Sequence, residues 1–213
     1  MPTLVYFGLQ GRAQATRYAL AAANVEFEDK KLTFEEWGPL KAAGTYGEGN
    51  SLPVFVDDDG TMYNQSKAIL KMVCAKNGFV PADAAGLYEQ EWYFDSLEDA
   101  GKVGDFAKAI FAKSEDEENI KKVAGGVVAM IEKLDARIGD KAFITGEGPS
   151  AADFQLLAGY TSLIANKNLH NPALSEITSA AADKATNYKR VIENVMALGG
   201  VQAAVDGLSA SFI

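Results

Sequence analysis

The hydrophobic and polar positions follow one pattern in the first part of the chain and another in the rest. Up to residue 78, short apolar runs typical of strands alternate with segments at helical spacing. From about Leu87 onward only helical spacing occurs, broken by glycine, proline and asparagine. The first part predicts the element order β-α-β-α-β-β-α, with strands at 4–7, 25–28, 54–56 and 62–63.

This change of pattern predicts an α/β domain at residues 1–78, a linker at 79–86 and an all-α helical domain at 87–213. A chain of 213 residues is long enough for either one large domain or two small ones. In the second part, Ser150 is predicted to cap a helix while Asp153 reaches back to it, which is a capping-box pattern.

Composition and charge exclude several classes of protein. The net charge of −9 argues against nucleic acid or an anionic membrane as partner, and most of it lies in the second part. No apolar run approaches the roughly 18 residues of a membrane-spanning helix. The first residues lack a basic segment followed by an apolar core, which predicts no secretory signal and a cytoplasmic location.

Cysteine and histidine offer little chemistry because the chain has one of each. Cys74 cannot form an internal disulfide, and its helical spacing with Leu70 and Val73 favours a buried core thiol over a reactive one. His170 lies in a predicted loop and is interpreted as a structural or surface residue. The sequence therefore predicts no metal site. It also contains no glycine-rich phosphate loop, so no nucleotide cofactor is predicted.

One stretch indicates a binding site for a small anionic peptide. Pro53 opens a predicted strand, where it removes a donor from the strand ladder and leaves neighbouring backbone groups for a ligand. About ten residues later, Asn64, Gln65 and Ser66 begin a predicted helix. The first turn of a helix offers unpaired N–H groups and a positive dipole end to a carboxylate.

Several motifs together resemble the cytosolic glutathione S-transferases, most closely the sigma class, with mu and alpha as neighbours. They are Tyr6-Phe7, Gly11-Arg12-Ala13, Trp37 with Lys41, Leu52-Pro53-Val54, Gln65-Ser66-Lys67-Ala68-Ile69 and the Ser150–Asp153 box. The resemblance implies a thioredoxin-like first domain and a helical second domain. It is specific over the first 78 residues, whereas the remainder matches only in helical plan, length and the capping box.

The resemblance implies that the chain adds the thiolate of its co-substrate glutathione to small hydrophobic electrophiles, without metal or nucleotide. Tyr6 is then the catalytic hydroxyl, although without the resemblance it would be interpreted as a core tyrosine. Arg12 would polarise the tyrosine and the thiolate, or would merely stabilise a helix start. The glutathione-binding residues that the resemblance implies are Trp37, Lys41, Ser51, Leu52, Pro53, Gln65, Ser66 and Asp99. The implied pocket for the hydrophobic substrate consists of Phe7, Gly8, Gly101, Gly104, Phe106 and Phe212.

The resemblance also implies a homodimer, because in this family the aspartate matched by Asp99 meets the ammonium of glutathione in the partner subunit. Simpler interpretations remain open: Gln65 and Ser66 as helix caps, Lys41 as a solvated lysine, and Asp99 on a solvated face. Ser51 stands where the family carries a longer side chain, in a loop at 44–51 that is longer than usual. The alternative to an enzyme is a noncatalytic relative that serves as a structural protein, like the S-crystallins, or as a carrier of hydrophobic ligands.

Overall fold

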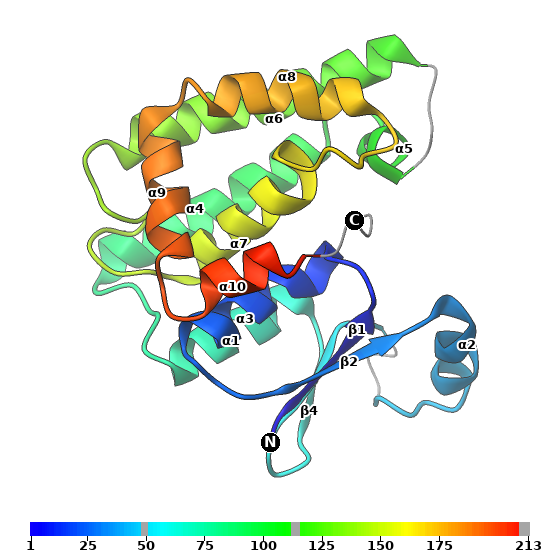
Figure 1. Cartoon of the computed structure of the whole chain (residues 1–213). Helices are drawn as coiled ribbons and strands as arrows, with labels where there is room; N and C mark the ends of the chain where they lie inside the picture. Colours follow the sequence, from blue (N-terminus) through cyan, green and yellow to red (C-terminus); the bar gives the residue numbers. More distant parts are fainter. Residues whose placement is uncertain (48–50, 112–115, 209–213) are drawn as a thin grey trace.

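The computed structural model describes residues 1–47, 51–111 and 116–208 (Figure 1). Its sheet has four strands in the order β2-β1-β3-β4. β1 pairs in parallel with β2, β3 is antiparallel to β1, and β4 is antiparallel to β3. The strands are β1 (Thr3–Phe7), β2 (Glu28–Leu32), β3 (Val54–Val56) and β4 (Met62–Tyr63). This mixed sheet confirms the predicted thioredoxin-like first half.

The second strand lies further along the chain than the predicted range 25–28. Glu28 pairs with Thr3, and the register continues to Leu32 opposite Phe7. β2 lies at the edge of the sheet, and its sequence Glu-Asp-Lys-Lys-Leu is mostly exposed and charged. The apolar residues Val25 and Phe27, which suggested the strand, instead pack against the core from the connection before it.

Helices cover the sheet and form the rest of the chain, as predicted (Figure 1). In the first half they are the 3₁₀ turn η1 (Gly11–Ala13), α1 (Gln14–Ala22), α2 (Phe34–Ala42) and α3 (Ser66–Lys76). In the second half they are α4 (Ala84–Gly101), α5 (Phe106–Phe111), α6 (Glu117–Ile138), α7 (Ala151–Gly159), the π-helix η2 (Tyr160–Ile164), α8 (Pro172–Ala182), α9 (Thr186–Met196) and α10 (Val201–Asp206). α4 begins three residues before Leu87 because Asp83 caps it by accepting a hydrogen bond from the Gly86 N–H.

One hydrophobic core connects the two halves of the chain. Buried residues of β1, α1 and α3 pack in the same cluster as those of α4, α6, α7 and α9. The buried Tyr18 hydroxyl of α1 lies 2.9 Å from that of Thr161 in η2. The division at residues 78–86 stays a prediction, because the main core extends across it.

The capping box at the start of α7 is confirmed. The carboxylate of the fully buried Asp153 accepts hydrogen bonds from the Ser150 N–H at 2.8 Å and from the Ile144 N–H at 2.7 Å. Asp153 thereby fixes the start of α7 to the loop that precedes it.

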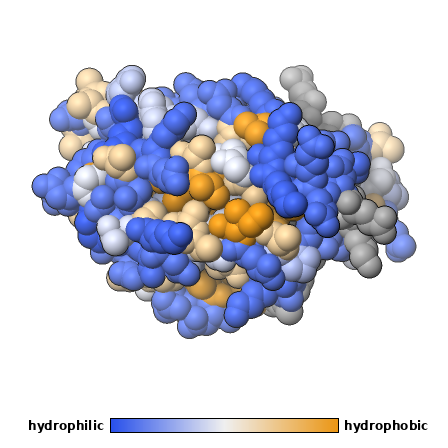
Figure 2. All heavy atoms as spheres, turned by 90° about the horizontal axis from the view of Figure 1, so that it is seen from above, coloured by the Kyte–Doolittle hydropathy of each residue, from blue (hydrophilic) through white to orange (hydrophobic). Residues whose placement is uncertain are grey.

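On the face shown in Figure 2, apolar side chains gather at the centre and hydrophilic side chains surround them. Among the described helices, none is both long and apolar enough to span a bilayer.

Candidate functional site

A cavity of about 860 Å³ lies where the end of β1, the start of α3, α4 and the segment around η2 meet. It contains five of the residues that the sequence predicted for the site: Tyr6, Phe7, Arg12, Gln65 and Ser66. The other residues that line it are Leu9, Gly11, Phe34, Lys67, Leu97, Glu98, Gln155, Ser162 and His170. Its size is in the range of small-molecule sites, which is roughly 300–1,000 Å³.

Tyr6 lines this cavity at the end of β1. The side chain is mostly buried, and its oxygen accepts a hydrogen bond from the Arg12 N–H at 3.2 Å. Because the oxygen acts as acceptor in that bond, the hydroxyl proton remains able to donate to a ligand. Gly11 leaves room for this contact: its φ is +42°, and a Cβ there would lie 2.8 Å from the tyrosine oxygen.

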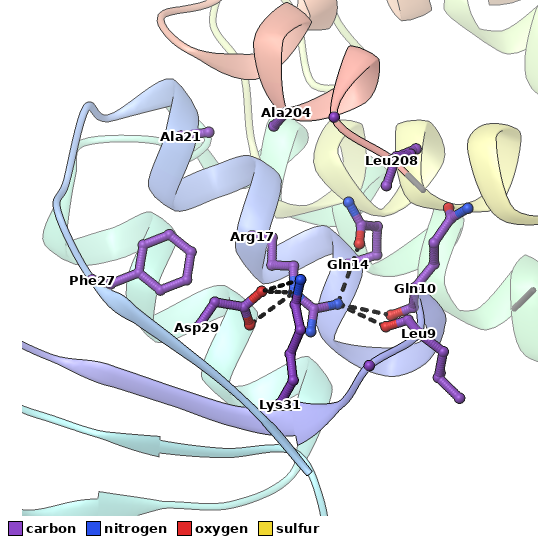
Figure 3. A pocket seen from close by; sticks show the side chains of 12 residues that line it. Leu9, Gln10, Gln14, Arg17, Ala21, Phe27, Asp29, Lys31, Ala204 and Leu208 are labelled. Atoms are coloured by element: carbon purple, nitrogen blue, oxygen red, sulfur yellow. Dashed lines mark hydrogen bonds and ion pairs between the residues drawn. The ribbon is translucent and has the colours of Figure 1, made fainter. Parts of the chain in front are cut away.

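Arg17 holds the loop that follows Tyr6, and the sequence analysis did not identify it (Figure 3). Its Nε donates to both carboxylate oxygens of Asp29 on β2, at 3.1 and 3.2 Å. Its guanidinium carbon lies 5.9 Å from the centre of the Tyr6 ring. The remaining guanidinium nitrogens donate to the carbonyl oxygens of Leu9 (2.9 Å), Gln10 (3.3 Å) and Phe7 (3.4 Å). Arg17 therefore ties α1, β2 and the loop together behind Tyr6.

The first turn of α3 forms a polar wall of the cavity. Gln65 immediately precedes the helix with a φ of +73°, in the left-handed region that non-glycine residues rarely adopt. Such strained residues cluster at functional sites. The backbone N–H groups of the first turn have no acceptor within the helix, so they can bind a carboxylate.

Two opposite charges lie side by side in the cavity wall. Lys67 on α3 and Glu98 on α4 form an ion pair, and Lys67 also lies over the Phe94 ring, 5.6 Å from its centre. The hydrogen bond from Lys67 lowers the pKa of Glu98 below its ordinary value, so Glu98 is ionised at neutral pH. The cavity thus offers a cation and an anion next to the start of α3.

The remaining walls are apolar on one side and polar on the other. Phe7 and Phe34 stack with their ring centres 4.4 Å apart, and Leu9 and Leu97 extend the apolar surface. Gln155 on α7, Ser162 in η2 and His170 add polar groups from the second half of the chain, and His170 was interpreted from the sequence as structural or surface. The cavity can hold a polar and an apolar group at the same time.

None of the other predicted glutathione-binding residues lines the cavity. Trp37 on α2 stacks against Tyr46, with ring centres 6.4 Å apart, and Lys41 is exposed on the last turn of that helix. Ser51 is exposed, and the Leu52–Pro53 peptide bond is cis, as the resemblance implied. Residues 48–50 of the predicted long loop lie outside the described residues. These roles stay predictions.

Asp99 also lies outside the cavity, although the preceding residue lines it. The Asp99 side chain is 77% exposed and pairs with Lys102, the residue that follows the end of α4.

The predicted pocket for the hydrophobic substrate is divided among several places. Gly8 lines a different hollow of about 300 Å³ beside Arg17 (Figure 3). Gly101 and Phe106 line another cavity of about 40 Å³, and Leu97 lines both this cavity and the large one. Gly104 has a φ of +67° and packs against α6, where a Cβ would meet the Asn119 oxygen at 2.7 Å. Phe212 lies outside the described residues. The role of these residues in a pocket for the hydrophobic substrate stays a prediction.

Cys74 is buried, and burial raises the pKa of its thiol above the ordinary value, in agreement with the predicted core role. Among the described residues, no group of three or more histidine, cysteine, aspartate or glutamate side chains is placed to hold a metal ion.

The chain is similar to known proteins over most of its length. Residues 2–73 match the family model described as "Glutathione S-transferase, N-terminal domain". Glutathione S-transferase P of Bos taurus is 32% identical over 159 residues, covering 73% of each chain. Glutathione S-transferase 4 of Caenorhabditis elegans is 30% identical over 176 residues, covering 76% of this chain and 80% of the relative. The solved structure of monomeric Na-GST-3, a glutathione S-transferase from the hookworm Necator americanus, has a TM-score of 0.80 at 19% identity and covers 100% of this chain and 99% of its own.

Proposed function

The chain belongs to the glutathione S-transferase family of enzymes, and we propose that its large cavity binds glutathione and conjugates it to small hydrophobic electrophiles. In this proposal Tyr6 stabilises the sulfur of glutathione as the thiolate. The thiolate forms a bond to an electrophilic carbon, and a leaving group such as chloride departs with the electron pair of the broken bond.

The observation that supports the proposal most is Tyr6, which lines the cavity and whose hydroxyl oxygen accepts the Arg12 N–H bond. A free thiol has a pKa of about 8.5, so ionisation near pH 6.5 requires roughly 2.7 kcal/mol of preferential stabilisation of the anion. A hydroxyl that donates to the thiolate forms a charge-assisted hydrogen bond of about this strength. The hydrogen bond that it accepts from Arg12 polarises the hydroxyl and makes it a better donor.

The walls of the cavity fit the rest of both substrates. The backbone donors at Gln65 and Ser66 would hold the γ-glutamyl carboxylate. The stacked rings of Phe7 and Phe34 offer an apolar surface to the electrophile. We propose the sigma class on the motifs in the sequence, and Trp37, Lys41, Ser51 and Leu52 as contacts of the glycine end. A single buried cysteine fits a reducing compartment, and we propose the cytoplasm.

The test compares wild type, Tyr6→Phe and the control Tyr88→Phe in the conjugation of glutathione to 1-chloro-2,4-dinitrobenzene. Tyr88 is 60% exposed and does not line the cavity. We expect Tyr6→Phe to raise the pKa of the bound thiol by about two units and to lower kcat/KM roughly 100-fold at pH 6.5, while glutathione still binds. Tyr88→Phe should match the wild type.

Two other outcomes would contradict parts of the proposal. An active Tyr6→Phe with an unchanged thiol pKa would show that another group activates the sulfur. Binding of glutathione by the wild type without any turnover would favour the noncatalytic alternative, a structural relative or a carrier of hydrophobic ligands.

A further inference from the structure

Helix α7 carries a half-buried glutamine among apolar residues. All of its residues are buried except Gln155 and Gly159. The other polar residue of α7, Asp153, is engaged in the capping box. Gln155 instead lines the large cavity, and its side-chain amide forms no hydrogen bond with any described residue. An amide in an apolar wall without a protein partner has its donors available to a ligand.

The segment that follows α7 holds this wall in place. Ser162 in η2 lies about two helical turns after Gln155 and lines the same cavity. The neighbouring Thr161 hydroxyl lies 2.9 Å from that of the buried Tyr18, which fixes η2 to α1. The Ser162 hydroxyl donates its proton to the Ala158 carbonyl, so its oxygen offers the cavity only an acceptor. Gln155 is therefore the side-chain donor that α7 and η2 offer to the cavity.

We propose that the electrophiles of this chain include α,β-unsaturated carbonyl compounds, and that the Gln155 amide donates a hydrogen bond to their carbonyl oxygen. The inference rests on the proposed function, because it names a substrate class for the same cavity. The stacked rings of Phe7 and Phe34 supply an apolar surface for the hydrocarbon part of such a compound.

The addition places negative charge on the carbonyl oxygen. The thiolate sulfur forms a bond to the β-carbon, the electron pair of the carbon–carbon double bond moves to join the α-carbon and the carbonyl carbon, and the carbonyl π pair moves to the oxygen. The resulting enolate takes a proton from solvent at its α-carbon and restores the carbonyl group. This proton replaces the one that the thiol released on ionisation, so the atoms of both substrates stay in the product.

A neutral amide donor suits this reaction because it binds the charged oxygen more strongly than the neutral carbonyl. The difference in strength lowers the barrier, since the charge develops only in the transition state. His170 also lines the cavity, but it lies in a loop and has an interaction partner already. Gln155 lies on a buried helix, which holds its amide in a defined direction.

The experiment compares two electrophiles with the wild type, Gln155→Met, Ser162→Ala, His170→Ala and Gln202→Met. One is the enone trans-3-nonen-2-one, followed by the loss of its absorbance. The other is 1-iodohexane, followed by iodide release, in which iodide carries the charge away and no oxygen is present. Methionine keeps the length of glutamine and removes its donor. Gln202 is exposed on α10, outside the cavity, and bonds to Asp206 at 2.8 Å.

We expect Gln155→Met to lower kcat and kcat/KM for the enone together, by about 10- to 100-fold, because the bond acts in the transition state. Its rate with 1-iodohexane and the pKa of its bound thiol should match those of the wild type. The other three variants should keep the ratio of the two rates.

Three results would overturn the inference: Gln155→Met slows both electrophiles equally or neither, it raises only KM for the enone, or His170→Ala or Ser162→Ala reproduces the loss that is specific to the enone. A wild type that conjugates 1-iodohexane but not the enone would also overturn it, while the proposed function would stand. If the wild type turns over neither electrophile, both proposals are wrong.

Discussion

Replacing Gly11 by alanine would test the packing that holds the Tyr6 hydroxyl in place. The added Cβ would lie 2.8 Å from the tyrosine oxygen and 2.7 Å from Cδ1 of Leu9. Ordinary contacts of a Cβ begin at 3.4 Å, so the hydroxyl would have to retreat by about 0.6 Å, the difference between 3.4 and 2.8. Its bond to the Arg12 N–H is already 3.2 Å long and would break with a shift of that size.

Gly11→Ala should have two separate effects, one on the stability of the fold and one on the rate of the reaction. Alanine at a φ of +42° destabilises the fold by roughly 1–2 kcal/mol, since side-chain residues disfavour left-handed backbone. Misplacement of the hydroxyl removes up to roughly 2.7 kcal/mol of thiolate stabilisation, so we expect kcat/KM to fall about 10- to 100-fold at pH 6.5. Gly60→Ala is the control, because its φ is +85° and no atom lies within 4 Å of its Cβ position.

The assays are the free energy of unfolding in urea, kcat/KM with the aryl chloride, and the pKa of the bound thiol from thiolate absorbance. Both variants should lose similar stability, and only Gly11→Ala should lose rate and raise the thiol pKa. If Gly11→Ala keeps the rate and thiol pKa of Gly60→Ala at equal stability, the position of the Tyr6 hydroxyl does not control the thiolate.

Two further predictions concern groups that support the site. Arg17→Lys keeps the charge but loses the planar donors to the loop carbonyls, so we expect a free energy of unfolding lower by about 1–3 kcal/mol and a lower kcat/KM. An unchanged free energy of unfolding and unchanged kinetics would show that Arg17 does not hold the loop in place. Burial raises the pKa of Asp153 from 3.8 to about 6, although its hydrogen bonds act to lower it. The folded chain therefore binds the Asp153 proton more tightly than the unfolded chain does. Its contribution to stability is therefore fully present below pH 3.8 and is lost, by roughly 3 kcal/mol, as the pH rises through 6. The difference between the urea-unfolding profiles of wild type and Asp153→Asn should show this fall, and a pH-independent difference would contradict it.

The sequence predicts the fold well where local chemistry and tertiary packing agree. The Ser150–Asp153 box at the start of α7 forms as predicted, and a second capping box at Thr33 starts α2, because each pattern satisfies its own backbone donors. The second strand was misplaced because apolar alternation marks a half-buried strand, and β2 is an exposed edge strand rich in charge. Its position is determined by parallel pairing with β1, which depends on residues distant in the sequence.

The predicted residues of the candidate site also differ in whether local structure or tertiary packing determines their position. Tyr6, Gln65 and Ser66 lie at the end of a strand and the start of a helix, where the backbone itself directs them toward the cavity. Trp37 follows a different constraint, since stacking on Tyr46 holds its ring in a small cluster beside the sheet. A sequence motif shows that Tyr6, Gln65, Ser66 and Trp37 are present, but only tertiary packing decides which of them line the same cavity.

Glu98 shows how far one residue of helix rotation can change the interpretation of a site. The run Leu97-Glu98-Asp99 carries two adjacent acids, and the sequence favoured Asp99 because the resemblance did. The orientation of α4 is determined by buried residues one turn or more away, such as Tyr93, Phe94 and Ala100, which pack into the core. These contacts turn Glu98 toward α3 and leave Asp99 in solvent. Which of these two adjacent acids faces α3 therefore depends on packing that no pattern at residues 97–99 contains.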